Sequence, residues 1–395
     1  MLRRFKGLAL LLAALLALMG ATAQAEETPA DYNRNVPQLL HEGHLYAQAA
    51  VLVDASNGDI LFAKNARQRM YPASTTKVMT LLLALESGIA MDTTIVIPKQ
   101  ASEIPADSSL IPVFPGDVMK FRDLLYGFML TSGNDGANAI AAIVSGNVEG
   151  FVDRMNRRAA ELGMEGTHFE NCTGLPAQGQ HTTARDVAVM ARQMFSHPEY
   201  FDYSAVWMED IDHGDGRVTQ LVNTNKLLKL YDGCDGGKTG STNEAGYCVA
   251  ATAKRSDMRL IAVVLGAASG KERFAIAGQM LDYGFANYRK YPVAARGTRV
   301  KGALPVTGGT ADGVALMLDG DLTLLVNRGD EQRVSLSPEL PEAVPAPVHA
   351  GDVVGHVTVN ADGREIARIP VVAAEDVPKK GGTLQRIFER WVLTV

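Results

Sequence analysis

The chain has 395 residues, with 38 Lys and Arg against 44 Asp and Glu, for a formal net charge of −6. This length allows two or three domains with cores of their own. The mildly acidic balance includes no basic tract of the kind that binds nucleic acid, and no glycine-rich nucleotide loop is present, so neither a nucleic-acid partner nor a cofactor is implied.

Residues 1–25 have the pattern of a secretory signal peptide. Three basic residues precede an apolar run from Leu8 to Met19, and small residues end the segment at Ala25. A transmembrane anchor is the alternative, but the run is shorter than the roughly 20 residues that a spanning helix needs. We therefore expect export with cleavage after Ala25. Loss of the three basic residues takes the formal net charge from −6 to −9.

The mature chain starts with a predicted β-hairpin and a predicted helix. Residues 49–65 hold two apolar runs around Asn57-Gly58, a strong signal for a tight turn. Ser74 then follows a proline and precedes an apolar stretch, a pattern typical of a helix start. In the simpler interpretation Ser74 is an N-cap. In the other, Lys77 shares a helix face with Ser74 and stands beside its hydroxyl as a base beside a nucleophile.

Two further short motifs carry polar residues of the same kind. Ser132-Gly133-Asn134 lies in a loop rich in Gly, Asp and Asn, where side chains can face a cleft. Lys238-Thr239-Gly240 occurs once, as does the Ser-x-x-Lys spacing. Ser-Gly-Asn occurs twice, but the second copy, Ser145–Asn147, follows an apolar run and is better explained as a helix C-terminus.

The segment up to residue 290 predicts an α+β domain. Helical spacing of apolar residues dominates from Ser74 to about Tyr203, for example in VEGFVDRMNRRAAELGM. A strand pair around the turn-like KRSD follows, and the helix KERFAIAGQMLDYGFANY closes the section. Strands at both ends with helices between them indicate one sheet assembled from distant segments, over residues 34–290.

Residues 291–373 change to short strands and turns, which predicts a small all-β domain. GVALMLD, LTLLVN, QRVSLS, VVGHVTVN and EIARIPVVA are strand-like, and Asp362-Gly363 marks a hairpin. Four prolines, at positions 338, 341, 345 and 347, predict a loop within this domain rather than a linker.

The last segment, residues 379–395, predicts an amphipathic membrane-anchoring helix. TLQRIFERWVLTV places its large apolar residues on one helical face. At about 1.5 Å per residue the helix is near 20 Å long, too short to cross roughly 30 Å of hydrocarbon, and it suits the membrane interface. Lys379–Gly382 is typical of a flexible tether. The alternative is a helix packed on the β domain.

Other residues that often bind metals or react give weaker signals. Three cysteines, at positions 172, 234 and 248, allow at most one internal disulfide and are better explained as buried small residues. His41 and His44 have a metal-like spacing without further ligands. Asp210–Gly216 hints at a calcium loop, but Gly214 stands where the third ligand is needed, so a turn is favoured.

Taken in order, YPASTTKVMT, MLTSGNDGANA, ELGMEGTHFENCTGL, TARDVAVMAR, GGKTGST and KERFAIAGQMLDYGF resemble the low-molecular-mass penicillin-binding proteins of the D-alanyl-D-alanine carboxypeptidase family. The resemblance covers nearly the whole mature chain. It implies a penicillin-binding/β-lactamase-like catalytic domain, an antiparallel sheet flanked by helices with a helical subdomain. It also implies removal of the terminal D-Ala from peptidoglycan stem pentapeptides through an acyl-enzyme, acylation by penicillins, and no cofactor.

The resemblance gives the catalytic residues their roles. Ser74 is the nucleophile, Lys77 is the base that takes its proton, and Ser132 relays a proton to the departing amine. Lys77 can act only when neutral, so its pKa must be lowered by burial and by a neighbouring positive charge, for which Lys238 is the natural source.

The remaining motif residues are expected to bind substrate. Asn134 hydrogen-bonds the substrate amide, and Lys238-Thr239-Gly240 lies on an edge strand where the peptide adds as a further strand. The backbone N–H groups of Ser74 and Ser241 form an oxyanion hole. Thr239 is one candidate for the terminal carboxylate, and Arg273 matches the family arginine that serves it. The family often has His after Lys-Thr-Gly, so side-chain assistance from Ser241 is in doubt.

Three other activities are weighed against this one. A serine β-lactamase shares the three motifs but needs a deacylating carboxylate in Glu-x-x-Leu-Asn, a pattern that the segment at Glu170 fails. An inactive peptidoglycan-binding or scaffold protein has no need of an intact set of motif residues. An endopeptidase that cuts cross-links between stem peptides stays open.

The expected partners follow from that activity. They are peptidoglycan stem peptides, β-lactam antibiotics as inhibitors, and membrane lipid through the C-terminal helix. The expected location is the outer face of the cytoplasmic membrane.

Overall fold

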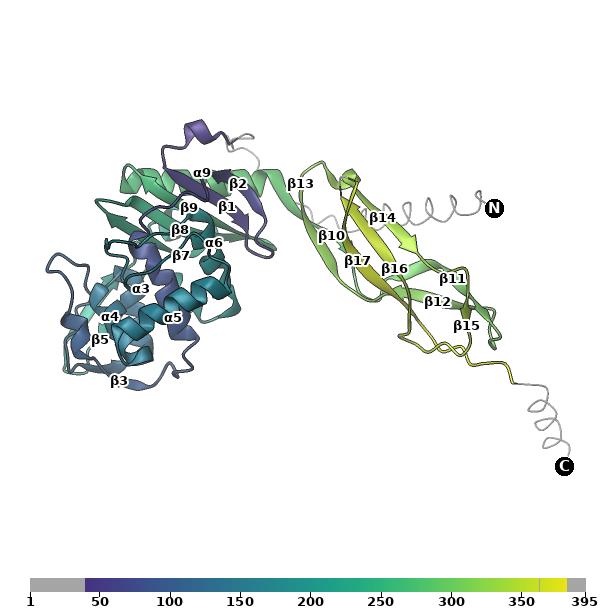
Figure 1. The fold of residues 1–395 in the computed structure, drawn as a ribbon, viewed down its shortest axis with the longest axis horizontal. Coiled ribbons are helices and arrows are strands. Elements are labelled where there is room, and N and C mark those ends of the chain that lie inside the picture. The colour runs from purple at the N-terminus through teal and green to yellow at the C-terminus, as the bar shows by residue number, and fades with distance from the viewer. Residues whose placement is uncertain (1–39, 362, 382–395) are drawn as a thin grey trace, which may run out of the picture. The chain divides into compact units, whose positions relative to one another are not determined.

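The computed structural model describes residues 40–361 and 363–381 of the chain. They divide into two compact units, one that ends at Asn287 and one that starts at Tyr288 (Figure 1). The predicted signal peptide, residues 1–25, and most of the predicted terminal helix, residues 382–395, lie outside the described residues. Within the described ranges, no helix is long and apolar enough to cross a membrane.

The first unit is built on a five-stranded antiparallel sheet in the order β2-β1-β9-β8-β7. Its strands are β1 (Ala49–Asp54), β2 (Ile60–Lys64), β7 (Cys234–Thr242), β8 (Gly246–Arg255) and β9 (Met258–Ala267). The predicted hairpin at Asn57-Gly58 is confirmed, and Gly58 takes the positive φ of 86° that the turn needs. Where the sequence analysis predicts a strand pair, the structure has three strands, and KRSD is the turn between β8 and β9.

Helices cover both faces of this sheet. Helix α9 (Gly270–Asn287) packs on β8 and β9 from one side, and α6 (Ala184–Gln193) packs on β1 and β9 from the other (Figure 1). The middle of β9 is buried throughout because both of its faces are covered. Strand β7 lies at one edge of the sheet, so one side of its backbone is free of a neighbouring strand.

The helical subdomain lies between the distant strands in the sequence. Its helices are α2 (Lys77–Leu85), α3 (Phe121–Thr131), α4 (Asn134–Ser145), α5 (Val148–Glu161), α7 (Tyr200–Ser204) and α8 (Leu227–Leu230), with 3₁₀ turns at Ala73–Thr76, Lys99–Ser102 and Met194–Ser196; a further 3₁₀ turn, Glu42–His44, precedes β1. Two hairpins interrupt it, β3 (Thr94–Val96) with β4 (Val118–Lys120) and β5 (Met208–Asp212) with β6 (Val218–Val222). Fully buried apolar side chains from α2, α3 and α5 form its core.

Two of the weaker sequence signals are resolved here. Helix α4 ends at Ser145, and Gly146 follows in the left-handed conformation, so the helix C-terminus predicted for Ser145–Asn147 is confirmed. Asn147 also caps α5 by accepting a hydrogen bond from Gly150 N. The turn predicted within residues 210–216 is confirmed as the connection of the β5–β6 hairpin.

The second unit is all-β, as predicted. A six-stranded sheet has the order β14-β16-β17-β12-β11-β15, and β10 pairs with β13 in a separate ribbon. The strands are β10 (Tyr288–Ala294), β11 (Arg299–Thr307), β12 (Gly313–Leu318), β13 (Leu322–Asn327), β14 (Val334–Glu339), β15 (Val344–Pro345), β16 (Val353–Ala361) and β17 (Arg364–Ala373), with a 3₁₀ turn at Glu331–Arg333. Strands β16 and β17 form the hairpin predicted at Asp362-Gly363.

Two expectations for the second unit need correction. Pro341 and Pro347 lie outside the strands as predicted, but Pro338 and Pro345 lie in β14 and β15, the two edge strands, where a missing N–H costs no ladder hydrogen bond. Lys379 and Lys380 are not a free tether, because Lys379 pairs with Gly309 and Lys380 N donates to Gly308 O at 2.8 Å. The chain is therefore attached to the second unit as far as Lys380.

Candidate active site

Ser74 and Lys77 meet at the junction of a 3₁₀ turn and a helix. Ser74 lies inside the turn Ala73–Thr76 rather than at the N-cap of α2, and Lys77 is the first residue of α2. Residues i and i+3 of a 3₁₀ turn are eclipsed, which brings the two side chains together more directly than an α-helix does. Ser74 Oγ and Lys77 Nζ are 3.1 Å apart.

The amine of Lys77 is buried among oxygen acceptors. Lys77 is 0% exposed, and its Nζ donates to Asn134 Oδ1 at 2.7 Å and to the Thr173 carbonyl at 2.6 Å. Burial lowers the pKa of Lys77 to about 7, against smaller opposing effects of Cys172 and Asp135. Burial, one of the two causes predicted from the sequence, is therefore the main cause of the lowered pKa.

Ser132 and Asn134 occupy the connection between α3 and α4. Ser132 has a left-handed backbone, with φ of 64°, and its Oγ is buried without a hydrogen-bond partner among the described residues. Asn134 opens α4, and its backbone N–H donates to Ser109 O at 2.7 Å. The side chain that the sequence analysis reserved for substrate is thus also a direct partner of Lys77.

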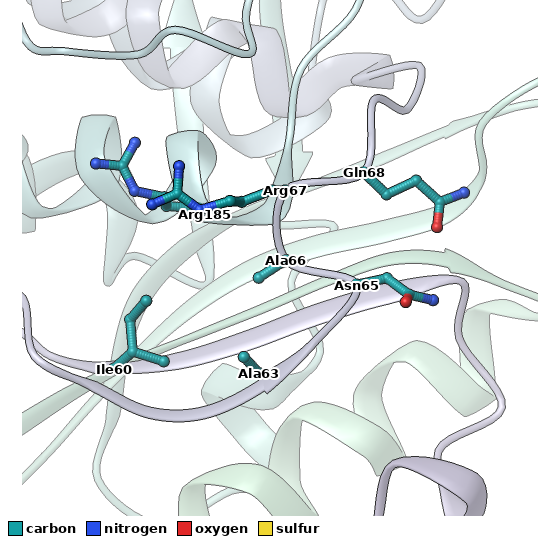
Figure 2. Close-up of a pocket in the computed structure, with 7 residues that line it drawn as sticks. All are labelled: Ile60, Ala63, Asn65, Ala66, Arg67, Gln68 and Arg185. Atoms are coloured by element: carbon teal, nitrogen blue, oxygen red, sulfur yellow. The ribbon is translucent and has the colours of Figure 1, made fainter.

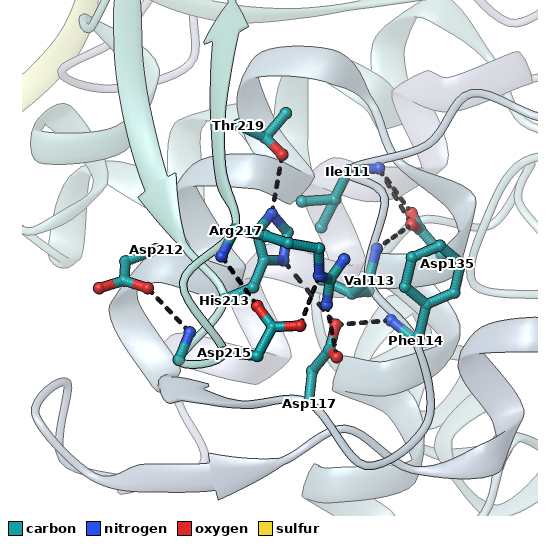
Figure 3. Close-up of polar contacts among 11 residues, drawn as sticks. Ile111, Val113, Phe114, Asp117, Asp135, Asp212, His213, Asp215, Arg217 and Thr219 are labelled. Atoms are coloured by element: carbon teal, nitrogen blue, oxygen red, sulfur yellow. Dashed lines mark hydrogen bonds and ion pairs between the residues drawn. The ribbon is translucent and has the colours of Figure 1, made fainter.

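The carboxylate of Asp135 binds the backbone of the loop formed by residues 103–117, which lies beside this connection. This buried carboxylate accepts hydrogen bonds from the backbone N–H groups of Ile111 and Val113, each at 3.0 Å (Figure 3). It also accepts from the N–H of Gly136 at 2.8 Å. Burial raises the pKa of Asp135, while these hydrogen bonds act in the opposite direction.

Asp117 ties the same loop to the β5–β6 hairpin. Its carboxylate accepts from Phe114 N at 2.8 Å and from Arg217 Nη2 at 2.6 Å, and it lies 3.8 Å from Nδ1 of the buried His213 (Figure 3). Two carboxylates therefore hold the loop of residues 103–117 in place. Asp135, next to Asn134 in the sequence, binds its backbone, and Asp117 connects it to the β5–β6 hairpin.

Lys238, Thr239 and Gly240 lie on the edge strand β7, as predicted for that motif. Lys238 is 1% exposed and its Nζ donates to the Thr239 carbonyl at 3.0 Å. Burial lowers the pKa of Lys238 well below its usual value, and the charges of Lys77 and Arg273 lower it further. The Thr239 hydroxyl lies 2.7 Å from that of Thr224.

Gly240 lets the edge strand approach the serine turn. A methyl group on Gly240 would lie 2.7 Å from Ser74 N and 2.9 Å from Ala73 Cβ, closer than any side chain can be. Ser241, the next residue, is exposed. Arg273 of α9 donates from Nη1 to the carbonyls of Gly240 and Cys248, at 2.9 and 3.2 Å, so it contacts β7 through the backbone.

The sequence motifs thus meet in one place, with different degrees of contact. Ser74, Lys77 and Asn134 form one hydrogen-bonded cluster, and Gly240 touches the turn that carries Ser74. Ser132 makes no hydrogen bond to either lysine in the described part of the chain. Thr173, whose carbonyl accepts a hydrogen bond from Lys77, was not predicted as a site residue. It lies in ENCTGL, part of a segment that carried the resemblance to the family.

The first unit also holds a separate pocket and three cysteine side chains. A pocket of about 430 Å³ is lined by residues of β2, the following segment and Arg185, and it includes no motif residue (Figure 2). The three cysteines are free thiols, and Cys172 and Cys248 are buried as expected. No group of three or more metal-binding side chains gathers within residues 40–361 and 363–381.

A serine hydroxyl beside a buried lysine amine, next to the free edge of an antiparallel sheet, is an arrangement that fits a serine peptidase. Comparison with known proteins agrees. The chain belongs to the D-alanyl-D-alanine carboxypeptidase family, whose profile matches residues 36–269. Residues 288–379 match the C-terminal domain of penicillin-binding protein 5.

Individual relatives resemble the chain over most of its length. D-alanyl-D-alanine carboxypeptidase DacF of Bacillus subtilis is 35% identical over 353 residues, 88% of this chain and 89% of its own. DacC of Escherichia coli is 32% identical over 89% of each chain. The crystal structure of penicillin-binding protein 5 from Haemophilus influenzae is 32% identical, with a TM-score of 0.69 over 85% of this chain and 98% of its own.

Proposed function

We propose that the protein is an exported serine-type D-alanyl-D-alanine carboxypeptidase that removes the terminal D-Ala from peptidoglycan stem pentapeptides through an acyl-enzyme on Ser74. The observation that carries this proposal is the 3.1 Å approach of Lys77 Nζ to Ser74 Oγ, inside the segment that matches the family. The expected inhibitors are penicillins, which acylate the same serine.

The surroundings of Lys77 suit a base in its neutral form. A neutral amine has two N–H donors and one lone pair. The carbonyl oxygens of Asn134 and Thr173 take the two donors, which leaves the lone pair for the Ser74 hydroxyl. A pKa of about 7 makes the neutral form abundant near neutral pH.

The reaction then has two halves. Lys77 takes the Ser74 proton, Oγ attacks the carbonyl carbon of the penultimate D-Ala, and the bond to the terminal D-Ala nitrogen breaks after that nitrogen gains a proton. Ser132, whose buried hydroxyl has no hydrogen-bond partner in the described part of the chain, is suited to pass this proton on. Water hydrolyses the ester in the second half and restores the Ser74 hydroxyl.

The edge strand supplies the binding groups. The substrate binds as an additional strand beside β7, and its amide group forms a hydrogen bond with Asn134. The backbone N–H groups of Ser74 and Ser241 donate hydrogen bonds to the oxyanion. The close contact between Gly240 and the serine turn supports this arrangement. Thr239 lies on the same strand and offers its hydroxyl to the substrate's terminal carboxylate, and the Lys238 amine donates a hydrogen bond to the Thr239 carbonyl.

Acylation by a labelled penicillin tests the central assignment. The wild-type protein should be labelled on Ser74, and digestion with mass spectrometry should locate the label there. Ser74→Ala should lose the label and keep the circular dichroism spectrum and melting temperature of the wild type. A label that persists in a folded Ser74→Ala variant would remove Ser74 from this role.

Arg273 is proposed to read the C-terminal carboxylate, as the resemblance implied. Its hydrogen bonds to Gly240 O and Cys248 O place the guanidinium against β7, and its Nε is buried without a partner among the described residues. Arg273→Ala should therefore reduce hydrolysis of D-Ala-D-Ala peptides more than acylation by an uncharged ester with the same acyl group. Equal losses on both substrates would leave Arg273 a structural role only.

The location is proposed from the two chain ends. Residues 1–25 direct export, and the C-terminal segment anchors the enzyme in the outer face of the cytoplasmic membrane. Because the chain is attached to the second unit through Lys380, the anchor has to start after Gly381. The full mature chain should sediment with anionic liposomes, and a chain that ends at Gly381 should stay in the supernatant with unchanged peptidase activity. If both stay in the supernatant, the anchor is wrong.

A further inference from the structure

The sheet of the first unit has a groove at the end of the β7–β8 hairpin. It has a volume of about 790 Å³ and starts at Ser241, directly after the Lys-Thr-Gly motif. Its lining comes from the ends of four strands, namely Tyr46–Gln48, Ser241–Glu244, Gly246–Tyr247 and Gly266–Ala268. The motif strand therefore runs from the candidate active site into this groove.

The opposite end of the β7 edge is closed. Asn225 Nδ2 donates to the Gly236 carbonyl at 3.1 Å, and Thr224 contacts Thr239. A methyl group on Gly236 would lie 2.6 Å from Ser204 Oγ of α7. A peptide on this edge therefore has little room beyond Thr239 and a free path beyond Ser241.

This asymmetry fixes the direction of a bound peptide. A C-terminal substrate has one residue after the bond that breaks, which fits the short closed side at Thr239. Its remaining residues must extend past Ser241, so the peptide lies antiparallel to β7. Strand residues are spaced by about 3.3 Å, which puts the residue before the D-Ala-D-Ala pair at Thr242 and Asn243, at the mouth of the groove.

The groove offers the chemistry of a cation site. Glu244 is the single charged residue in its lining, and it is exposed. Tyr46 and Tyr247, with 75% and 39% of their surfaces exposed, add aromatic faces that attract an ammonium group. The Arg273 guanidinium already lies over one face of the Tyr247 ring, 5.6 Å from its centroid, and its Nη1 hydrogen bonds go to the backbone of β7 and β8.

We propose that this groove binds the side chain of the residue before the D-Ala-D-Ala pair, and that Glu244 selects a side chain ending in a free amine. The proposal rests on the proposed carboxypeptidase function and adds a substrate preference to it. Glu244 is a specificity residue and takes no part in acylation.

Two peptides that differ only in acetylation of one side-chain amine, which removes its charge, test the proposal. They are Nα-acetyl-L-Lys-D-Ala-D-Ala with a free side-chain amine and the same peptide acetylated on that amine. For an exposed ion pair worth about 0.2–1 kcal/mol, the wild type should favour the free amine in kcat/KM by about 1.4- to five-fold. The preference should shrink as salt is added.

Three variants sharpen the result. Glu244→Gln should remove the preference, and Glu244→Lys should favour a peptide whose lysine is succinylated and thus anionic. Glu165→Gln, which neutralises an exposed glutamate outside the groove lining, should keep the wild-type preference. A wild type without preference, or a preference that survives in both Glu244 variants, would overturn the proposal.

Penicillin labelling separates this proposal from the function on which it rests. The acyl side chain of benzylpenicillin carries no amine for Glu244 to bind, so labelling of Ser74 should proceed at the same rate in the wild type and in Glu244→Gln. Normal labelling without a lysine preference refutes the groove alone. Failure to label Ser74 in the wild type refutes the proposed function itself.

Discussion

The two units of the molecule bury different kinds of side chain. The first unit encloses two lysines and three aspartates, namely Lys77, Lys238, Asp54, Asp135 and Asp186, each at most 1% exposed. In the described part of the second unit, Thr358 is the one polar side chain among the buried residues. Burial of a charge is costly unless hydrogen bonds compensate it, and such groups concentrate where chemistry requires them.

The packing of side chains serves different purposes in the two units. In the first unit, hydrogen bonds fix a lysine whose proton affinity is lowered, and glycines let backbone segments approach one another. In the second unit, a layer of buried aliphatic side chains holds a six-stranded sheet together. Substitutions at the buried polar groups of the first unit should therefore affect activity more than stability. Substitutions in the core of the second unit should affect stability more than activity.

The largest expected effect is on Lys77. Lys77→Arg keeps the positive charge but cannot give it up, because a guanidinium stays protonated. We expect acylation by penicillin and peptide hydrolysis to fall by about 10³-fold or more, the upper part of the range for a general base. Stopped-flow acylation rates measure this. Appreciable turnover in a folded Lys77→Arg variant would point to another base.

The next effect concerns the contact between Gly240 and the serine turn. Gly240→Ala has to displace the turn or β7, because its methyl group would lie 2.7 Å from Ser74 N. A displacement of about 1 Å can reduce a rate on the order of 10²-fold. Gly43→Ala is a matched control, since a methyl group there meets nothing within 4 Å. If both variants acylate at the wild-type rate, the close contact has no catalytic importance.

The pH dependence should show the lowered pKa of Lys77 directly. Protonated Lys77 is inactive, so kcat/KM should rise about tenfold per pH unit below about 7 and level off above it. The observed value can belong to the coupled pair Lys77 and Lys238, because each charge disfavours the other. A rate that keeps rising to pH 10 would mean that burial does not lower this pKa.

The sequence predicted more of the fold than of the site geometry. Alternating and helical patterns gave the α+β and all-β units, because periodic burial leaves a local signal. The pattern missed β10 and β11, which carry prolines and charged residues, and it did not separate β7 from β8 as strands of one antiparallel sheet.

Long-range contacts explain what the motifs could not predict. Thr173 contacts Lys77 across 96 residues of sequence through a backbone carbonyl, which leaves no trace in side-chain type. The unpartnered hydroxyl of Ser132 depends on packing from several segments. The motifs identify which residues gather, because their chemistry is specific, but the distances between them follow only from the folded chain.

A substitution in the core of the second unit should have the smallest effect on activity, and it tests the division of roles between the two units. Ile369 of β17 is 4% exposed and lies opposite Val357 of β16. Ile369→Ala should lower the free energy of unfolding of this unit by about 2–5 kcal/mol through the cavity that it leaves. Penicillin acylation per folded molecule should stay at the wild-type rate.

Ile366 of the same strand is the matched control, because it is 45% exposed. Ile366→Ala should change the free energy of unfolding by only about 0.5 kcal/mol or less. Calorimetry on both variants, with acylation rates measured well below the melting temperature, separates the two outcomes. If Ile369→Ala slows acylation by the folded protein while Ile366→Ala does not, the apolar core of the second unit contributes to catalysis, and the division of roles between the two units fails.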